Sequence, residues 1–279
     1  MSYKTILVIL RDLEDTKHVL DTALELTNKF DSHLIGLHAE PAVRATFAAP
    51  IEIPDSSVLE FDQGEIEQRM EALGSAFKEK CEREGVPWEW RPIRSLSGDN
   101  ALSALSSARC ADIVVVRQQE DEREEDYIDL EALVLDGGRP VLFVPYVGRQ
   151  SVAVEHALIA WNGSREAARA VFDALPLLQT AKDVEVLTVD PEDNAEQSKL
   201  MAGAEIAAAL TRHGVSVTTK TEVSDGLPAA SVIQNRLSDT GSDLLVMGGY
   251  SKSRLREYLF GGVTRTMLKS MPNLTLMSR

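Results

Sequence analysis

The chain has 279 residues, of which 44% are hydrophobic and 26% charged, and its formal net charge at pH 7 is −15. This length accommodates two domains of ordinary size, each with its own buried core. The negative charge argues against nonspecific binding to nucleic acid or to anionic membranes, because both require a basic surface.

The charge is distributed unevenly along the chain. Residues 1–150 contain 16 basic and 29 acidic side chains, a net charge of −13, whereas residues 151–279 contain 13 and 15, a net charge of −2. We therefore expect any phosphate-bearing ligand to prefer the second half.

Two further features indicate a cytoplasmic protein. The first apolar run, residues 5–10, is far too short to cross a membrane, and the few residues before it leave no room for a signal peptide. Cys81 and Cys110 are isolated from each other and from any His-rich cluster, which favours reduced, buried thiols over a disulfide or a metal site.

The first half alternates between strand and helix patterns. The predicted strands cover residues 5–10, 33–39, 88–94, 113–116 and 140–144. The predicted helices cover about 16–30, from about 63 to Gly85, and 102–108, with Asp15 or Thr16 as the first N-cap. Between the second strand and the next helix, residues 41–62 form a long segment with several apolar side chains, so we expect much of it to pack on a domain or on a partner copy.

The second half repeats this order. The predicted strands cover residues 157–161, 184–189, 215–221, 244–247 and 274–277. A helix with Ala168, Val171, Phe172 and Leu175 follows the turn Asn162–Gly163–Ser164, where Ser164 is the expected N-cap. Further helices are predicted at 195–213 and 231–237, and another begins at Val263.

Landmarks in the two halves show a tandem duplication. Three of them recur at offsets of 129, 131 and 132 residues: Gly85 with Gly214, Asp112 with Asp243, and Pro140 with Pro272. The first strands, Ile6 against Ala157, differ by 151 residues, because the segment around 41–62 is an insertion in the first copy. We therefore predict an α/β fold with two domains, residues 1–148 and 152–279, each an open, parallel, five-stranded sheet with helices on both faces.

The strongest functional signal lies near the end of the chain. The apolar strand 244–247 ends at Gly248 and Gly249, and a second glycine pair, Gly261 and Gly262, precedes a helix. Glycines after a strand allow a ligand to approach the backbone closely, and exposed N–H groups at a helix start attract anions. This pattern predicts a phosphate site at the carboxyl edge of the sheet, where ligands of such folds bind.

The order of strand, Asx-Gly-Ser turn, helix, Asp-Leu-Leu-Val-Met-Gly strand and spaced glycines resembles the universal stress protein family, over essentially the whole chain in two copies. Nucleotide-binding members of that family carry Gly, two residues, Gly, nine residues, Gly, then Ser or Thr. Gly248 and Gly261 match the first and third glycines. The chain departs from the pattern at Ser251, at Gly262 and at Asn162, where the family has Gly, Ser or Thr, and Asp respectively.

The resemblance implies a stress-response protein with an adenine nucleotide α-hydrolase-like, Rossmann-like fold. It implies an adenine nucleotide (ATP, ADP or AMP) as a regulatory ligand of the second domain, with Mg²⁺ only alongside ATP. It also implies domains paired through their last strands, here as an intramolecular pseudo-dimer, and allows a homodimer of whole chains. The residues that it places near the ligand are Trp161, Asn162, Gly163, Val189, Asp190, Met247, Gly248, Gly249, Ser251, Lys252, Gly261, Gly262, Val263 and Thr264.

The first copy has lost this motif. Arg117, Gln118 and Gln119 follow its fourth strand, an acidic run occupies residues 120–126, and Arg11 takes the place of Asn162. We expect this half to have a structural or partner-binding role.

Two functional classes stay open at this point. One is a nucleotide-binding module, which the glycines and the charge asymmetry favour. The other is a nucleotide-independent regulatory or scaffold protein, which the departures at Ser251, Gly262 and Asn162 favour. We do not expect an enzyme, beyond slow ATP hydrolysis at most, because no general base or set of metal ligands is visible.

Overall fold

A computed structural model of the chain describes residues 2–41, 56–96, 98–119, 128–146, 151–191, 203–250 and 262–279, with residues 56–62 described by their backbone alone. The first half contains β1 (Thr5–Ile9), α1 (Asp15–Phe30), β2 (His33–Pro41), α2 (Ser56–Glu84), β3 (Trp88–Ser95), α3 (Asn100–Ala108), β4 (Ile113–Arg117), α4 (Leu130–Asp136) and β5 (Val141–Val144). The second half contains β6 (His156–Ala160), α5 (Arg165–Asp173), α6 (Leu175–Leu178), β7 (Asp183–Val189), α7 (Ala204–Arg212), β8 (Val217–Glu222), α8 (Ala229–Thr240), β9 (Leu244–Gly248), α10 (Val263–Lys269) and β10 (Leu274–Ser278).

The predicted α/β class is confirmed, with parallel strands in each half. The strand order is β3-β2-β1-β4-β5 in the first half and β8-β7-β6-β9-β10 in the second. The two halves therefore have the same topology, as a duplication requires. The register also agrees, since Ile6 pairs with Ile113 in the first half and Ala157 with Leu244 in the second.

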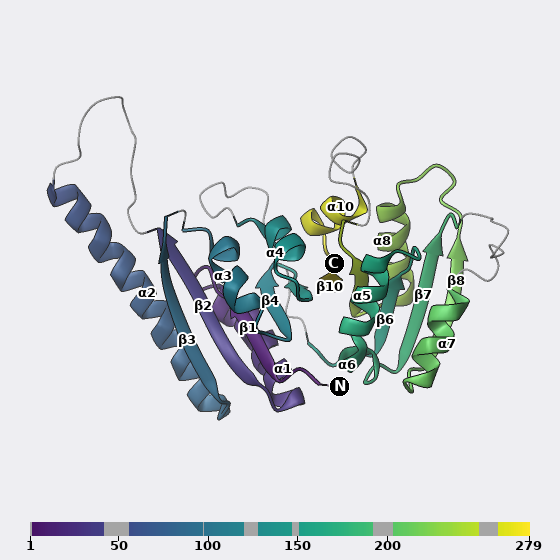
Figure 1. Cartoon of the computed structure of the whole chain (residues 1–279), viewed down its shortest axis with the longest axis horizontal. Coiled ribbons are helices and arrows are strands. Elements are labelled where there is room, and N and C mark those ends of the chain that lie inside the picture. The colour runs from purple at the N-terminus through teal and green to yellow at the C-terminus, as the bar shows by residue number, and fades with distance from the viewer. Residues whose placement is uncertain are drawn as a thin grey trace.

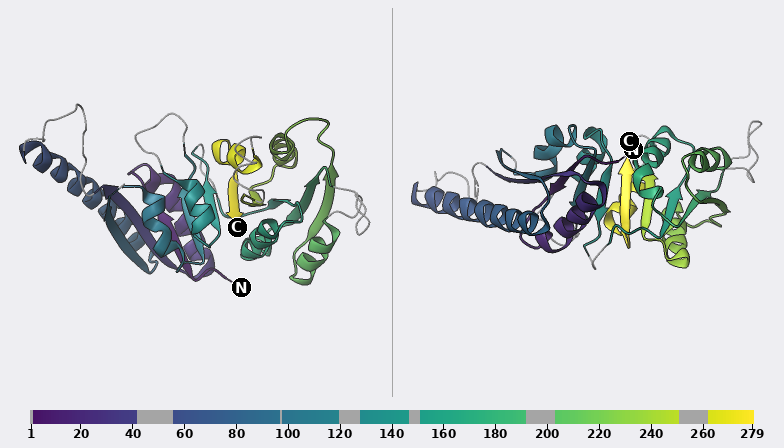
Figure 2. Two further views of the ribbon diagram at one scale, coloured as in Figure 1. Left: turned by 45° about the horizontal axis from the view of Figure 1, so that its top comes forward. Right: turned by 90° about the horizontal axis from the view of Figure 1, so that it is seen from below.

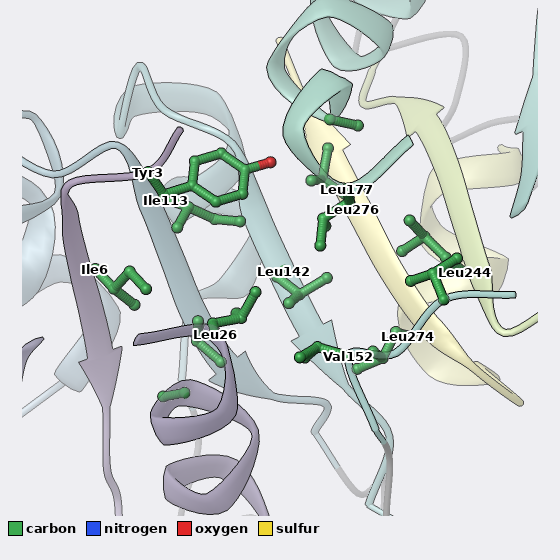
Figure 3. Packing of buried hydrophobic residues seen from close by; sticks show 14 of the residues in the cluster. Tyr3, Ile6, Leu26, Ile113, Leu142, Val152, Leu177, Leu244, Leu274 and Leu276 are labelled. Atoms are coloured by element: carbon green, nitrogen blue, oxygen red, sulfur yellow. The ribbon is translucent and has the colours of Figure 1, made fainter. Parts of the chain in front are cut away.

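The expectation of two separate sheets was wrong. β5 and β10 pair antiparallel, with Leu142 opposite Leu276, so the described strands form one continuous ten-stranded sheet. An unpaired strand edge exposes N–H and C=O groups, and both strands are apolar and buried, so pairing satisfies two edges at once. Figure 2 shows β10 in the middle of the molecule, and Figure 3 shows Leu142 beside Leu276. The predicted pairing through the last strands is thus present as a ladder of hydrogen bonds.

Side chains alternate between the two faces of the sheet and build two buried clusters. One cluster joins Ile6 and Val8 to residues of α1, α2, α5, α6 and α7, and the other joins Leu7 and Ile9 to residues of α3, α4, α8 and α10. Each fully buried Leu, Ile or Val stabilises the fold by about 1.5–3 kcal/mol. Figure 1 shows the two halves splayed apart, with α2 outside the first, α7 outside the second, and α4 and α10 above their junction.

Several predicted boundaries need correction. α2 begins at Ser56 rather than near Gln63, so part of the predicted insertion is helical; residues 42–55, where most of its packing was predicted, lie outside the described residues. Helix α4 was not predicted at all. α1 is capped at Glu14 without a side-chain hydrogen bond, so neither Asp15 nor Thr16 is its N-cap. The predicted domain boundary, between residues 148 and 152, lies mostly outside the described part and stays a prediction.

Phe172 of α5 is 42% exposed, and the expected burial of the two cysteines holds for one of them. Cys81 is a buried free thiol as expected, but Cys110 is exposed.

Candidate functional site

The candidate site lies at the carboxyl ends of β6, β7 and β9. β6 pairs with β7 on one side and β9 on the other, so the strand order of the second half reverses between β6 and β9. Ligands of open α/β sheets bind at such switch points. The predicted site residues that the structure describes come from these strand ends and from the start of α10.

The turn after β6 is built by local hydrogen bonds. Asn162 Oδ1 accepts the Ser164 N–H at 3.1 Å, and Gly163 has a φ of 72°, which a residue with a side chain rarely adopts. Ser164 is the N-cap of α5 as predicted, since its Oγ accepts the Ala167 N–H at 3.1 Å. Asn162 and Gly163 are exposed. Trp161 is half-buried, and its backbone N–H donates to the Leu187 carbonyl. The turn therefore presents an amide side chain at the switch point.

The end of β7 is fixed by Asp190. Its φ is 44°, its N–H donates to the Glu222 carbonyl, and its Oδ1 accepts the Ser224 N–H at 3.0 Å. Asp190 thus ties β7 to the segment after β8, and Val189 before it is half-buried.

The glycines at the end of β9 permit close packing. A methyl group built on Gly248 would lie 2.5 Å from the Ala167 nitrogen and 2.6 Å from the Glu166 carbonyl carbon, so only glycine lets α5 approach β9 this closely. A methyl group on Gly249 would lie 2.6 Å from Val134 Cγ1, which belongs to the first half. Close packing therefore explains why both positions are glycine, in addition to the predicted ligand contact.

The backbone after these glycines is held by internal hydrogen bonds. The Gly249 N–H donates to the Ser278 carbonyl at 2.8 Å, and the Tyr250 N–H donates to Thr264 Oγ1 at 3.1 Å. Tyr250 is buried with a φ of 53°, an uncommon conformation for a large residue. In this arrangement neither of these two N–H groups points to a ligand, whereas we expected donors around Gly249.

Helix α10 provides the other side of the site. Gly262 precedes it in an extended conformation, and α10 begins at Val263 without a side-chain cap. Thr264 and Met247 are buried and Val263 is half-buried. The predicted site residues Ser251, Lys252 and Gly261 lie outside the described residues, so their part of the motif stays a prediction.

One acidic group lies beside the switch point. Glu166 is buried in the first turn of α5, and its Oε1 is 2.6 Å from Arg165 Nε. Burial by itself would raise the pKa of Glu166, but the hydrogen bonds from Arg165 and from its own backbone outweigh it and lower the pKa. Glu166 therefore adds a negative charge near Gly248.

The equivalent region of the first half is filled by side chains. The strand registers place Arg117 where the second half has Gly248. The Arg117 guanidinium contacts three carboxylates, those of Asp15 at 2.7 Å, Asp12 at 2.9 Å and Glu14 at 3.5 Å. Burial by itself would lower the pKa of Arg117, but these carboxylates raise it. The first half thus has a salt-bridge cluster in place of a glycine-lined site.

A second ionic cluster in the first half, built on the buried His38 and Glu40, was not predicted from the sequence. His38 Nε2 lies 3.3 Å from Glu40 Oε1, and Arg69 donates to both oxygens of Glu40, at 3.0 and 3.1 Å. The His38 ring also contacts the Leu10 carbonyl at 2.8 Å through Nδ1. No local pattern indicated the cluster, because Arg69 follows the insertion and reaches Glu40 only through α2.

The described residues contain no group of three or more His, Cys, Asp or Glu side chains arranged to hold a metal ion. Among them, no helix is both long and apolar enough to cross a membrane.

Comparisons with known proteins agree on the fold. The model of the universal stress protein family matches residues 153–279. A universal stress protein from Archaeoglobus fulgidus is similar over 99% of this chain and 98% of its own, with 14% identity and a TM-score of 0.68. A functionally unknown protein from Pseudomonas aeruginosa is similar over 99% and 92%, with 15% identity and a TM-score of 0.55.

A third similar structure has a different context. The cytoplasmic domain of a prokaryotic cation chloride cotransporter covers 99% of this chain and 95% of its own, with 14% identity and a TM-score of 0.51. At these identities the likeness shows the shared fold alone. No curated protein matches the sequence.

Proposed function

Since residues 153–279 belong to the universal stress protein family and residues before them repeat its fold, we propose that this chain is a cytoplasmic stress-response protein that binds an adenine nucleotide in its second half as a regulatory ligand. One observation carries the proposal, the difference between the two switch points. The second half has Gly248 and the exposed Asn162–Gly163 turn where the first half has Arg117 and a salt-bridge cluster. At this equivalent position the first half has a large charged side chain and the second half has none.

The described residues suggest how such a ligand would be held. Asn162 can donate and accept hydrogen bonds through its amide, which suits an adenine edge. The start of α10 has no side-chain cap, and the backbone N–H groups of a helix start favour anionic groups such as phosphate. Mg²⁺ is expected only together with ATP.

A specific observation favours the alternative, a nucleotide-independent regulatory or scaffold protein. The N–H groups of Gly249 and Tyr250 are already hydrogen-bonded within the protein. The backbone and Cβ of Glu166, an acidic residue, also lie against Gly248. Under this alternative the fold serves as an interaction surface.

Calorimetric titration with ATP and AMP tests the proposal. We expect wild type to bind, Asn162→Ala to bind more weakly, and Gly261→Asp to lose binding, because an aspartate adds a negative charge where the motif predicts a phosphate. Ser251→Gly combined with Gly262→Ser restores the family pattern and should tighten binding about tenfold. Leu13→Ser is the matched control, since Leu13 is exposed in the equivalent turn of the first half and should leave affinity unchanged.

Two outcomes would contradict the proposal. If Gly261→Asp binds as well as wild type, the ligand does not occupy this site. If the restored double variant binds neither nucleotide, the scaffold alternative takes over. The same samples, incubated with ATP, test the prediction that the chain is not an enzyme beyond slow hydrolysis.

A further inference from the structure

The end of β9 packs against a helix of the other half. A methyl group on Gly249 would lie 2.6 Å from Val134 Cγ1, and its next neighbour, the Ser278 carbonyl oxygen, is 3.8 Å away. Val134 is buried in α4. A β-branched residue in a helix has one strongly preferred side-chain rotamer, so Val134 cannot move aside at low cost. The position of Gly249 is therefore set by a side chain from the first half.

A second contact joins α4 to the other side of the candidate site. Arg265 Nε in α10 lies 3.6 Å from Glu131 Oε1 in α4. The residue before it, Thr264, accepts the Tyr250 N–H. Through these contacts, α4 touches both described ends of the motif, the end of β9 and the start of α10.

The equivalent position in the first half makes a different contact across the junction. Gln118 follows β4 as Gly249 follows β9, and its Nε2 donates to the Leu268 carbonyl of α10 at 3.2 Å. Gln118 is fully buried, so this position in the first half is filled by an amide side chain. The close contact between a glycine and a helix of the opposite half is therefore made at the second switch point.

From these contacts we propose that α4 of the first half positions the Gly249–Tyr250 backbone, so that the ligand site of the second half is built from both halves. Val134 is the main positioning residue, and Glu131 supports the start of α10. This inference rests on the proposed function for its ligand, an adenine nucleotide. It assigns the first half, which has no glycine-lined site of its own, a direct part in the site of the second.

Size complementation across the junction tests this inference. Gly249→Ala alone introduces a methyl group against Val134 and should weaken ATP binding about 10- to 100-fold, since small displacements of a binding backbone have effects of this size. Val134→Ala removes Cγ1, so the double variant should recover to within about threefold of Val134→Ala alone. Gly248→Ala is the matched control, because its methyl group meets the α5 backbone and Val134→Ala should not rescue it.

Hydrogen exchange of the full chain without ligand provides an independent readout. We expect the Gly249 and Tyr250 amides to exchange faster in Gly249→Ala and to regain protection in the double variant. If the effects of the two single substitutions on the amide exchange rates simply add in the double variant, α4 does not position this backbone and the inference fails. If exchange is rescued but wild type binds no nucleotide, the positioning role stands and the proposed ligand is wrong.

Discussion

At the scale of residues, Arg117 is the largest difference between the halves. Its side chain is 10% exposed and that of Asp15 is fully buried, so the pair is shielded from water on both sides. Removing one partner of a buried ion pair leaves the other charge buried without compensation.

We therefore expect Arg117→Ala to destabilise the protein by about 3–5 kcal/mol, measured by urea unfolding. The control is Arg91→Ala, whose exposed pairing with Glu89 should contribute no more than about 1 kcal/mol. Equal losses in the two variants would show that the Arg117 cluster adds nothing beyond a surface ion pair.

The Glu40 cluster predicts a loss of stability in acid. Burial by itself would raise the pKa of Glu40, but the hydrogen bonds from His38 and Arg69 outweigh it and lower the pKa from 4.5 to about 2. Because the folded pKa lies below the unfolded one, the contribution is complete above about pH 4.5 and is lost as the pH falls towards 2.

Glu40→Gln should be less stable than wild type at pH 7, and the difference should shrink between pH 4.5 and 2.5, followed by thermal unfolding. Glu67→Gln is the control, since Glu67 pairs with Arg94 on the surface. A stability difference for Glu40→Gln that stays constant over this range would contradict the assignment.

At the scale of elements, the long helix α2 packs on β3 through an aromatic cluster. Phe77 is fully buried, with its ring centroid 5.1 Å from that of Trp90 and 5.8 Å from that of Trp88. Gly36 of β2 provides the space, because a methyl group there would lie 2.5 Å from the Phe77 ring.

Phe77→Ala should cost about 3–5 kcal/mol of stability, measured by chemical unfolding, because the cavity cannot close around two tryptophans. Phe172→Ala deletes the same atoms from the exposed position in α5 and should cost far less. A small effect at Phe77 would mean that α2 is held mainly by other contacts.

Elements that are periodic and bounded by turns could be predicted from the sequence. The strands around Ile6 and Leu244, the N-cap at Ser164 and the duplication itself all follow from local patterns and spacing. Helix α4 could not be predicted, because its seven residues are too few to show a helical pattern of apolar side chains.

The candidate site was predictable only in part, for a related reason. The glycines at 248 and 249 are visible in the sequence, but their neighbours are Ala167 and Val134, which no local pattern connects to them. Likewise, the Arg117 cluster joins charges from two distant segments, and only the folded sheet brings them together. Local patterns thus indicated where the site lies, whereas its internal contacts depend on packing between elements.

At the scale of the whole molecule, β5 and β10 make the junction between the halves. Each strand would be an edge without the other, and β10 would expose Leu276 beside an unpaired backbone. We therefore expect residues 151–279, produced alone, to form dimers through β10, detected by analytical ultracentrifugation. Leu276→Lys should reduce this association, since a charged side chain on an edge strand opposes pairing. A monomeric fragment would show that the junction does not drive association.

The covalent junction also frees the halves from symmetry. In a dimer of identical chains the interface must be self-complementary, so every substitution occurs twice and alters both clefts. Here one copy has Gly248 and Gly249 where the other has Arg117 and Gln118. Across the junction Gly249 meets Val134, whereas Gln118 donates to the Leu268 carbonyl. Fusion thus allowed one switch point to hold a salt-bridge cluster while the other kept its glycines, an asymmetry that the symmetry of a homodimer excludes.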